Sequence, residues 1–179
     1  MFKKKCLDLN FFLQQNQIGF VIKDAGSANQ IIHFIKNLKI NNYKIYALSP
    51  ARDMWINKNR TQNLVENYQE LIDSCDVVLI GTGFPGEEIK ILKELNRKKK
   101  YTIALIDHWT NYKLRFLYNK NYEFPQTIWV TDKYALKIAK NEFDDNIPIG
   151  LIPNFYLNDR LKLISKVKQK QVNFLYLLE

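Results

Sequence analysis

The sequence predicts an α/β protein of Rossmann-like type, in which helices cover both faces of a mostly parallel sheet. Short apolar runs rich in β-branched residues alternate with longer segments whose apolar residues recur at helical spacing. Five or six such runs are present, and helices separate them, which indicates parallel strands joined by crossover helices. Right-handed crossovers would place the loops that follow these strands at one edge of the sheet.

In the first half of the chain we expect three strands. They are predicted at residues 18–24, 43–49 and 76–80. A loop of small residues follows the first strand, and a helix with a clear apolar face begins near Ala28. The segment after the second strand reads as a polar loop near the same edge of the sheet, with Arg52, Asp53 and Trp55. A helix over residues 63–74 then returns the chain to the sheet.

The second half of the chain repeats this alternation. A helix is predicted over residues 85–97, because Pro85 suits a first helical turn and acidic and basic residues lie at the expected ends. The next segments are a strand at 101–106, a short helix at 112–118, a loop at 119–126 and a strand at 127–131. Asp132 is expected to cap a helix that runs to Lys140, and a last short strand lies at residues 147–152.

The predicted domain spans residues 18–156, after a lead-in at residues 1–17. Residues 157–179 differ in character: a basic amphipathic helix over residues 157–170 precedes VNFLYLLE, which reads as a strand. Such a strand either pairs at an edge of this sheet or begins a second domain. We favour the second domain, with the Lys-rich KVKQKQ as the linker to it.

The composition is that of a folded, basic protein. Hydrophobic residues make up 46% of the chain and aromatic residues 13%, which is enough to fill a core, and the net charge is +9. The charge comes mainly from Lys and reflects either general amino-acid usage or a surface that binds a membrane or a polyanion. A nucleic-acid interface is disfavoured, because the basic residues lie at helix ends and in the tail and are not interleaved with aromatic residues.

Two cysteines, Cys6 and Cys75, form neither a bridge framework nor a metal-binding spacing, so we expect a reducing compartment and no zinc site. The N-terminus is a poor signal peptide, because polar residues interrupt its apolar part. No run approaches the roughly 20 apolar residues of a membrane-spanning helix. We therefore expect a cytoplasmic protein that can make peripheral contact with the inner face of the membrane.

A glycine turn, Gly81-Thr82-Gly83, follows the strand at residues 76–80. Glycine lacks the Cβ atom and lets a ligand approach the backbone closely, although the same residues also suit a simple tight turn. The dinucleotide fingerprint G-x-G-x-x-G is absent after the first strand, which argues against an NAD enzyme. Glu87 either holds a ligand hydroxyl or simply interacts with the positive end of its helix.

An acid, an imidazole and an indole follow the strand at residues 101–106, as Asp107, His108 and Trp109. Ligands of open parallel sheets bind beyond this end of the strands. Histidine titrates near neutral pH, so His108 could be a general base that Asp107 orients, or Asp107 could take the proton itself. Alternatively, both side chains only bond the loop backbone. His33, by contrast, lies on the apolar face of the first helix and is expected to be a packed or half-exposed residue.

Further candidate residues lie near the glycine turn and the Asp107-His108-Trp109 segment. Trp109 and Tyr112 could stack on a sugar ring or pack the loop, and Arg115 could bind a phosphate or pair with an acid. The loop after the first strand carries Asp24 and Ser27, which are helix-capping residue types that could also contact a ligand. Capping is the simpler interpretation for these two residues.

Several runs of the sequence together resemble a known family. It contains GTGFPGEEIKILKELNRKKKYTIALIDHWTNYKLRF, PQTIWVTDKYALKIAK and IPNFYL, in this order. These runs are similar to the N-terminal half of GT-B-type glycosyltransferases and their sugar-nucleotide epimerase relatives in bacterial surface-polysaccharide pathways. The resemblance covers about residues 18–156, and residues 107–116 are its most specific part.

The resemblance implies one half of a GT-B two-domain architecture, with the active site between two Rossmann-like domains. This half would hold the acceptor, and a second domain would bind most of the nucleotide-sugar donor, which is a co-substrate. A sugar would pass to a hydroxyl of a saccharide or lipid-linked acceptor, and His108 or Asp107 would accept the proton. Neither a metal ion nor a cofactor is required, because helix N-termini and basic side chains can stabilise the diphosphate.

Two sets of site residues follow from these arguments. The expected catalytic residues are His108 and Asp107. The expected substrate-binding residues are Gly81, Thr82, Gly83, Glu87, Trp109, Asn111, Tyr112, Arg115, Asp24, Gly26 and Ser27. The alternative is a non-catalytic module of Rossmann-like shape that binds a nucleotide or a sugar and whose last strand completes its own sheet.

Overall fold

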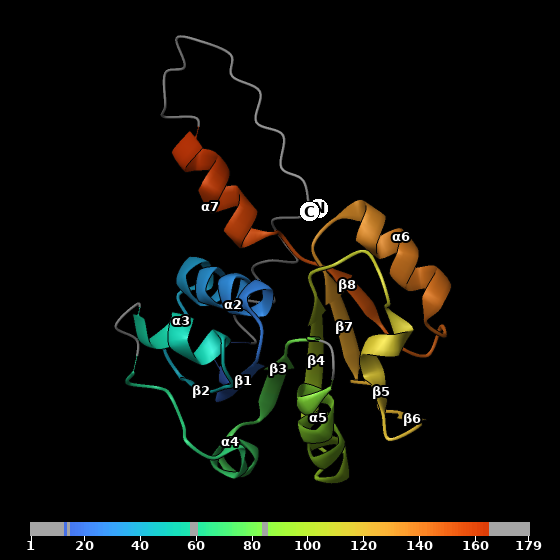
Figure 1. Ribbon diagram of the computed structural model, residues 1–179, viewed down its shortest axis with the longest axis horizontal. Coiled ribbons are helices and arrows are strands. Elements are labelled where there is room, and N and C mark those ends of the chain that lie inside the picture. Colours follow the sequence, from blue (N-terminus) through green and yellow to red (C-terminus); the bar gives the residue numbers. More distant parts are fainter. Residues whose placement is uncertain (1–12, 14, 58–60, 84–85, 165–179) are drawn as a thin grey trace.

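A computed structural model describes residues 13, 15–57, 61–83 and 86–164 of the chain (Figure 1). Within them, a six-stranded sheet has the strand order β2-β1-β3-β4-β7-β8, and every pair of neighbours is parallel. The strands are β1 (Ile18–Ile22), β2 (Tyr43–Ala47), β3 (Val77–Ile80), β4 (Tyr101–Ile106), β7 (Thr127–Val130) and β8 (Ile149–Leu151). The predicted α/β, Rossmann-like fold is therefore confirmed.

Helices cover both faces of this sheet, as Figure 1 shows. They are α2 (Ala25–Leu38), α3 (Ala51–Asn57), α4 (Tyr68–Ser74), α5 (Glu87–Arg97), α6 (Lys133–Glu142) and α7 (Phe155–Ile164). Successive strand residues face two separate cores: Phe20 packs with residues of α2 and α3, and Val21 packs with residues of α4, α5 and α6. The strands are therefore continuous apolar runs, with all of β1 and β3 buried.

Carboxylates cap the helices that follow β1 and β7. In both Asp24 and Asp132, Oδ1 accepts a hydrogen bond from the backbone N–H three residues later, at 2.7 and 2.8 Å respectively. The predicted cap at Asp132 is confirmed. Because Asp24 is also a cap, α2 begins at Ala25 and not near Ala28, and β1 ends two residues before the cap.

The segment expected to be a polar loop after the second strand is the helix α3, so that prediction was wrong. Ala51 and Trp55 lie four residues apart and are both fully buried against the sheet. The polar residues of the segment lie on its outer side, where Arg52 Nη2 donates a hydrogen bond of 2.6 Å to Glu66. Two buried positions are enough to hold this short helix, although its composition is polar.

The predicted helix over residues 63–74 is also shorter than expected. Residues 63–65 run beside β2: the Ile45 N–H donates to the Asn63 carbonyl at 2.7 Å, and the Val65 N–H donates to the Ile45 carbonyl at 2.8 Å. This pairing uses the backbone groups that a helix would need. Helix α4 begins only after Asn67, whose side chain accepts a hydrogen bond from the backbone of Gln69 at 2.8 Å.

The segment between β4 and β7 contains an element that the sequence analysis did not predict. The expected helix at residues 112–118 is a 3-10 helix, Lys113–Phe116, and a two-stranded antiparallel hairpin follows it. The hairpin strands are β5 (Leu117–Tyr118) and β6 (Asn121–Tyr122), within the region expected to be helix and loop. Asn119 and Lys120 adopt positive φ at the turn, which apolar patterning does not reveal.

Towards the C-terminus, α7 packs beside α2 and points away from the sheet (Figure 1). It begins two residues earlier than the predicted basic helix at residues 157–170, and it is described to Ile164. The VNFLYLLE strand, Pro85 and most of the predicted lead-in at residues 1–17 lie outside the described residues. In the part of the chain that the structure describes, no helix has both the length and the apolar character needed to cross a bilayer.

Candidate functional site

The order of the strands defines where a ligand would bind. Strand β1 lies between β2 and β3. The chain therefore adds β2 on one side of β1 and then crosses back to add β3 on the other side. In open parallel sheets, ligands bind beyond the carboxyl ends of the strands at such a switch point. Asp24 follows β1, Gly81 follows β3 and Asp107 follows the neighbouring β4. The glycine turn and the Asp107 corner therefore emerge from adjacent strands at one edge, as predicted.

The turn after β3 makes hydrogen bonds to β4, to Arg115 and to α5. The Thr82 hydroxyl donates a hydrogen bond of 3.2 Å to the Leu105 carbonyl of β4. The Thr82 carbonyl accepts a bond of 2.6 Å from Arg115 Nη1, and the Gly83 N–H donates a bond of 2.8 Å to Glu88 Oε2. The turn is thus part of a bonded structure that joins β3, β4 and α5.

The glycines of this turn are required by the close approach of carboxyl groups. A Cβ atom on Gly81 would lie 2.6 Å from Glu88 Oε1, and a Cβ atom on Gly83 would lie 2.7 Å from Asp24 Oδ2 and 2.8 Å from Glu88 Oε2. No described glycine has positive φ, so backbone conformation is not the reason. A Cβ atom on Gly26 would similarly collide with a carboxylate oxygen of Asp107.

Three carboxyl groups consequently meet at this edge, and we call Asp24, Glu88 and Asp107 the carboxyl cluster. Asp24 and Asp107 were predicted from the sequence as site residues, but Glu87 was predicted in place of Glu88. Glu87 is 62% exposed and pairs with Lys23 Nζ at 3.0 Å, whereas Glu88 is fully buried. A signal was present, because Glu88 lies at helical spacing from the apolar Ile91, Leu92 and Leu95.

Burial is the main influence on the pKa of Glu88. Burial and the nearby Asp24 raise the pKa of Glu88 to about 8, against the opposing effects of the Gly83 N–H and the neighbouring Lys23. The side chain is therefore mainly protonated at neutral pH. Its Oε1 atom is buried without a hydrogen-bond partner in the described structure.

Asp107 and His108 occupy different environments. The Asp107 side chain is 9% exposed and that of His108 is 60% exposed, and His108 Nε2 lies 3.7 Å from Asp107 Oδ1. This separation is too long for a hydrogen bond, so the structure does not show Asp107 orienting the imidazole. Burial, followed by the charge of Asp24, raises the pKa of Asp107, while His108 and Arg115 oppose the shift.

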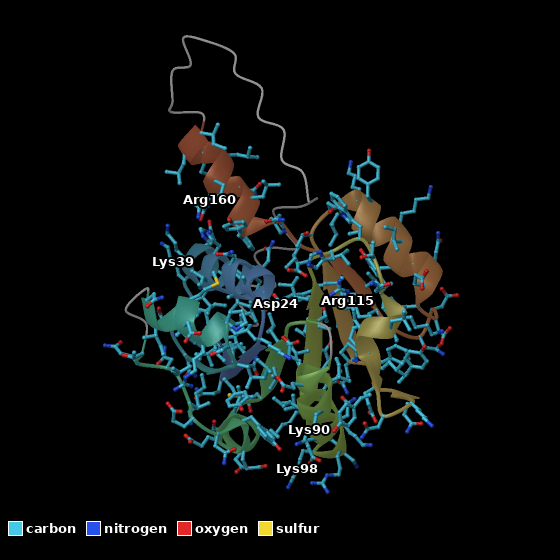
Figure 2. The ribbon with its side chains drawn as sticks, viewed as in Figure 1. Asp24, Lys39, Lys90, Lys98, Arg115 and Arg160 are labelled. Atoms are coloured by element: carbon cyan, nitrogen blue, oxygen red, sulfur yellow. The ribbon has the colours of Figure 1, made fainter. Side chains whose placement is uncertain are left out.

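Arg115 connects the loops that follow β3 and β4. It is buried, and its Nε donates a hydrogen bond of 3.1 Å to the Thr110 carbonyl in addition to the Nη1 bond to Thr82. Its described hydrogen bonds thus go to backbone carbonyls, and neither a phosphate nor an acid is needed to explain its position. In the view of Figure 2, Arg115 and Asp24 lie on either side of β4.

The aromatic candidates separate into one exposed and one buried residue. Trp109 is 63% exposed, and its indole N–H donates a bond of 2.8 Å to Asp132 Oδ2, which fixes the ring at the rim. Tyr112 is buried and packs against Phe143, so it belongs to the core. Asn111 has a φ of 58° and its carbonyl accepts the Arg115 backbone N–H at 3.0 Å, which is a structural role in the turn.

The remaining predicted contacts form the first turn of α2. Ser27 is buried, and its hydroxyl donates a hydrogen bond of 3.1 Å to the Asp24 carbonyl. The cap of α2 is therefore Asp24, whereas Ser27 lies inside the helix and supplies the N–H that Asp24 accepts. Gly26 lies against Asp107. Among the residues described, no group of three His, Cys, Asp or Glu side chains is arranged to hold a metal ion.

No protein-family model, curated protein or solved structure matches this chain.

Proposed function

We propose that this chain is the acceptor-side part of a glycosyltransferase that moves a sugar from a nucleotide-sugar donor to a hydroxyl acceptor in polysaccharide or glycolipid synthesis. One observation supports the proposal above the others. Asp107 lies at the switch-point edge of a Rossmann-like sheet, largely buried and beside a second carboxylate, with a raised pKa. These are the properties of a general base that takes a proton from a hydroxyl near neutral pH.

In the proposed reaction, the acceptor oxygen attacks the anomeric carbon of the donor sugar. The bond between that carbon and the diphosphate oxygen breaks, and the electron pair leaves with the diphosphate. The proton of the acceptor hydroxyl passes to the ionised Asp107 carboxylate. Groups outside the described residues, on a second domain, would bind the nucleotide and the diphosphate.

His108 has a secondary place in this mechanism. It is exposed, and it approaches Asp107 without a hydrogen bond, so Asp107 is the stronger candidate for the base. Trp109 offers a fixed and exposed ring at the rim, where it can stack on a sugar. The basic surface of the protein would suit a lipid-linked acceptor at an anionic membrane.

Turnover of a panel of nucleotide sugars tests the proposal, with the protein from the full reading frame. We expect Asp107→Asn to lower kcat by at least about 100-fold, the lower end of general-base contributions, and His108→Ala to have a smaller effect. Asp76→Asn is the matched control, because Asp76 directly precedes β3 and so lies at the opposite, amino end of the strands. Wild-type rates in both Asp107→Asn and His108→Ala would remove the proposed roles, and absence of turnover with every donor would refute sugar transfer.

The second candidate is a non-catalytic module that binds a nucleotide or a sugar. The strand order β2-β1-β3-β4 at the start of the sheet is also that of flavodoxin-like binding domains, which favours this reading. Saturable sugar or nucleotide binding by a protein that turns over no donor would support it.

A further inference from the structure

Helix α7 is attached to α2 along one of its sides. Phe155 packs edge-to-face against Phe34 of α2, with the ring centroids 6.0 Å apart. One turn later, Asp159 Oδ2 lies 2.7 Å from Nδ1 of His33, which is also in α2. Residues four apart in a helix lie on the same side of it, so these two contacts define the side of α7 that faces α2. Residues on the opposite side point away from α2.

An apolar stripe lies on that opposite side. Leu157, Leu161 and Ile164 are spaced four and three residues apart, which aligns them along the helix. At about 100° per residue, their mean direction is roughly opposite to that of Phe155 and Asp159. Their exposed fractions are 49%, 53% and 63%, and we call these three residues the α7 stripe. Contiguous exposed apolar side chains, unlike scattered ones, are typical of a surface that binds a partner.

The charges around the α7 stripe are basic. Arg160 is exposed and lies one turn from both Leu157 and Ile164, on the flank of the stripe. The acidic residue of the helix, Asp159, lies on the side that faces α2 and contacts His33. After Ile164 the sequence continues as SKVKQKQ, which adds three lysines and no acidic residue. The stripe is therefore combined with positive charge.

This combination fits an anionic lipid surface best. Nucleic-acid bases are bound mainly by stacking on aromatic rings, which aliphatic side chains cannot provide. A stable protein interface buries roughly 800 Å² on each partner, more than three side chains of a ten-residue helix can supply. In an anionic bilayer, by contrast, the acyl boundary takes up aliphatic side chains and the headgroups attract basic ones.

The position of α7 relates the stripe to the candidate site. Strand β8 ends at Leu151 and α7 begins at Phe155, so the helix leaves the sheet at the carboxyl end of a parallel strand. Asp107 follows β4 at the same edge. Figure 1 shows α7 pointing away from the sheet at this end of the molecule. A bilayer that binds α7 would therefore lie at the end of the sheet where Asp107 is found.

We propose that α7 is a peripheral membrane anchor. The α7 stripe enters the boundary of an anionic bilayer, and Arg160 and the basic residues beside it interact with the headgroups. One short helix of this kind gives reversible binding and does not span the bilayer. The membrane contact does not depend on sugar transfer. Only its use, to bring the Asp107 edge close to a lipid-linked acceptor, rests on the proposed function.

Cosedimentation of the whole chain with lipid vesicles tests this proposal. One set of vesicles is pure phosphatidylcholine, and in the other about a third of the lipid is phosphatidylglycerol. At low ionic strength we expect at least about tenfold tighter binding to the anionic vesicles, and weaker binding as salt is added. Equal binding to both sets, or binding to neither, would overturn the proposal.

Matched variants locate the contact. Leu161→Gln should weaken binding to anionic vesicles at least about fivefold, because its side chain no longer enters the apolar boundary. Leu114→Gln, at a similarly exposed leucine of the 3-10 helix, should bind like the wild type. Arg160→Gln should weaken binding about fivefold, the effect of one basic residue near an anionic surface. Lys98→Gln should have little effect, because Lys98 lies at the opposite end of the molecule in Figure 2. Losses as large in the two controls as in the two α7 variants would overturn the proposal.

Other occupants of the α7 stripe would be recognised in the same protein samples. A dimer in lipid-free solution that Leu161→Gln dissociates, measured by analytical ultracentrifugation, would assign the stripe to a second copy. A thermal melt of Leu161→Gln that shows the loss of stability of a core substitution would mean that another part of the chain covers the stripe. Either result would overturn the proposal, and Arg160→Gln tests the membrane contact without changing the stripe.

The anchor and the transferase can fail separately. Binding to anionic vesicles by a protein that turns over no nucleotide sugar would refute the transferase and leave the anchor in place. Turnover by a protein that binds no vesicles would refute the anchor and leave the transferase in place.

Discussion

The backbone N–H of Gly83 donates a hydrogen bond of 2.8 Å to the buried Oε2 atom of Glu88. This contact attaches the turn after β3 to the first turn of α5, at the edge of the sheet where a ligand would bind. It also explains why glycine is found in the turn, because the carboxyl groups occupy the space that a side chain would need. The same contact makes the turn sensitive to the protonation of one carboxyl group.

Glu88 should make the stability of the protein depend on pH. Its pKa is about 8 in the folded state, against an ordinary value of 4.5. Between these values the folded state holds a proton that the unfolded state has lost, so the free energy of unfolding falls as pH rises, by up to about 1.4 kcal/mol per pH unit. We expect Glu88→Gln to remove this contribution, so that urea denaturation at pH 5.5 and 7.5 shows a flatter dependence in the variant.

The neighbouring Glu87→Gln is the control for that measurement. Glu87 is exposed, so its replacement should leave the wild-type slope between pH 5.5 and 7.5 intact. If Glu88→Gln shows the same slope as wild type, Glu88 is ionised throughout this range and our description of the site is incorrect.

Gly81→Ala should destabilise the protein by about 1–3 kcal/mol, because the new Cβ atom forces Glu88 or the turn to move. The nearest atoms would be Glu88 Oε1 at 2.6 Å and Ser27 Cβ at 2.8 Å. Gly86→Ala is the comparison, since its new Cβ atom would meet ordinary contacts at 3.5 Å. It should cost less than about 1 kcal/mol, from the change of a helix cap. Chemical denaturation of both variants checks the order, and a costlier Gly86→Ala would contradict it.

Asp132 should stabilise α6 and hold Trp109 at the same time. Its Oδ1 caps the helix through Ala135, and its Oδ2 accepts the Trp109 indole N–H. Asp132→Ala should cost about 1 kcal/mol of stability, the typical effect of losing a cap. The amide of Asp132→Asn has one acceptor oxygen in place of two. We therefore expect this variant to keep the cap and to weaken the hydrogen bond from the Trp109 indole.

The indole proton of Trp109 in NMR spectra separates these two effects. Its resonance should move upfield in Asp132→Ala as the bond to the carboxylate is lost. Trp109→Phe should leave the cap, and hence the stability of α6, nearly unchanged because the side chain is largely exposed. A large loss of stability in Trp109→Phe would mean that the ring packs in the core.

Helix α7 should depend on Asp159 for its attachment to α2. Asp159 Oδ2 lies 2.7 Å from His33 Nδ1 and accepts a hydrogen bond of 3.0 Å from Asn37 Nδ2. The hydrogen bonds with His33 and Asn37 hold the pKa of Asp159 well below its usual range, although partial burial opposes them. Its stabilising effect is therefore present above the unfolded pKa of about 3.9 and is lost as pH falls below it.

Hydrogen exchange in α7 measures this attachment. We expect Asp159→Asn to speed amide exchange over Phe155–Ile164 at neutral pH, while exchange in the central strands stays unchanged. Asn158→Ala, at the exposed neighbouring position, serves as the control. Unchanged exchange in Asp159→Asn would show that aromatic packing, such as that between Phe34 and Phe155, is sufficient to hold the helix.

Local patterns in the sequence were enough to predict most of the fold. The strands β1, β3 and β4 are apolar on both faces, so each is recognisable from consecutive residues alone, and a cap such as Asp132 is visible three residues from its partner. The helix α3 and the hairpin β5-β6 escaped prediction for a physical reason. Trp55 is buried by contacts with residues distant in the sequence, and positive φ at Asn119 is set by the turn that it closes.

The sequence by itself determined that parallel strands deliver Asp24, the Gly81 turn and Asp107 to one edge, because strand direction and crossover hand follow from local rules. Only the tertiary structure decided the chemistry of that edge. It placed Glu88 inside and Glu87 outside, and it left His108 exposed while Asp107 turned inward. Burial and the distances between charges determine which carboxyl groups are protonated and which side chains a ligand can contact. Burial and these distances depend on residues that are neighbours in space but far apart in the chain.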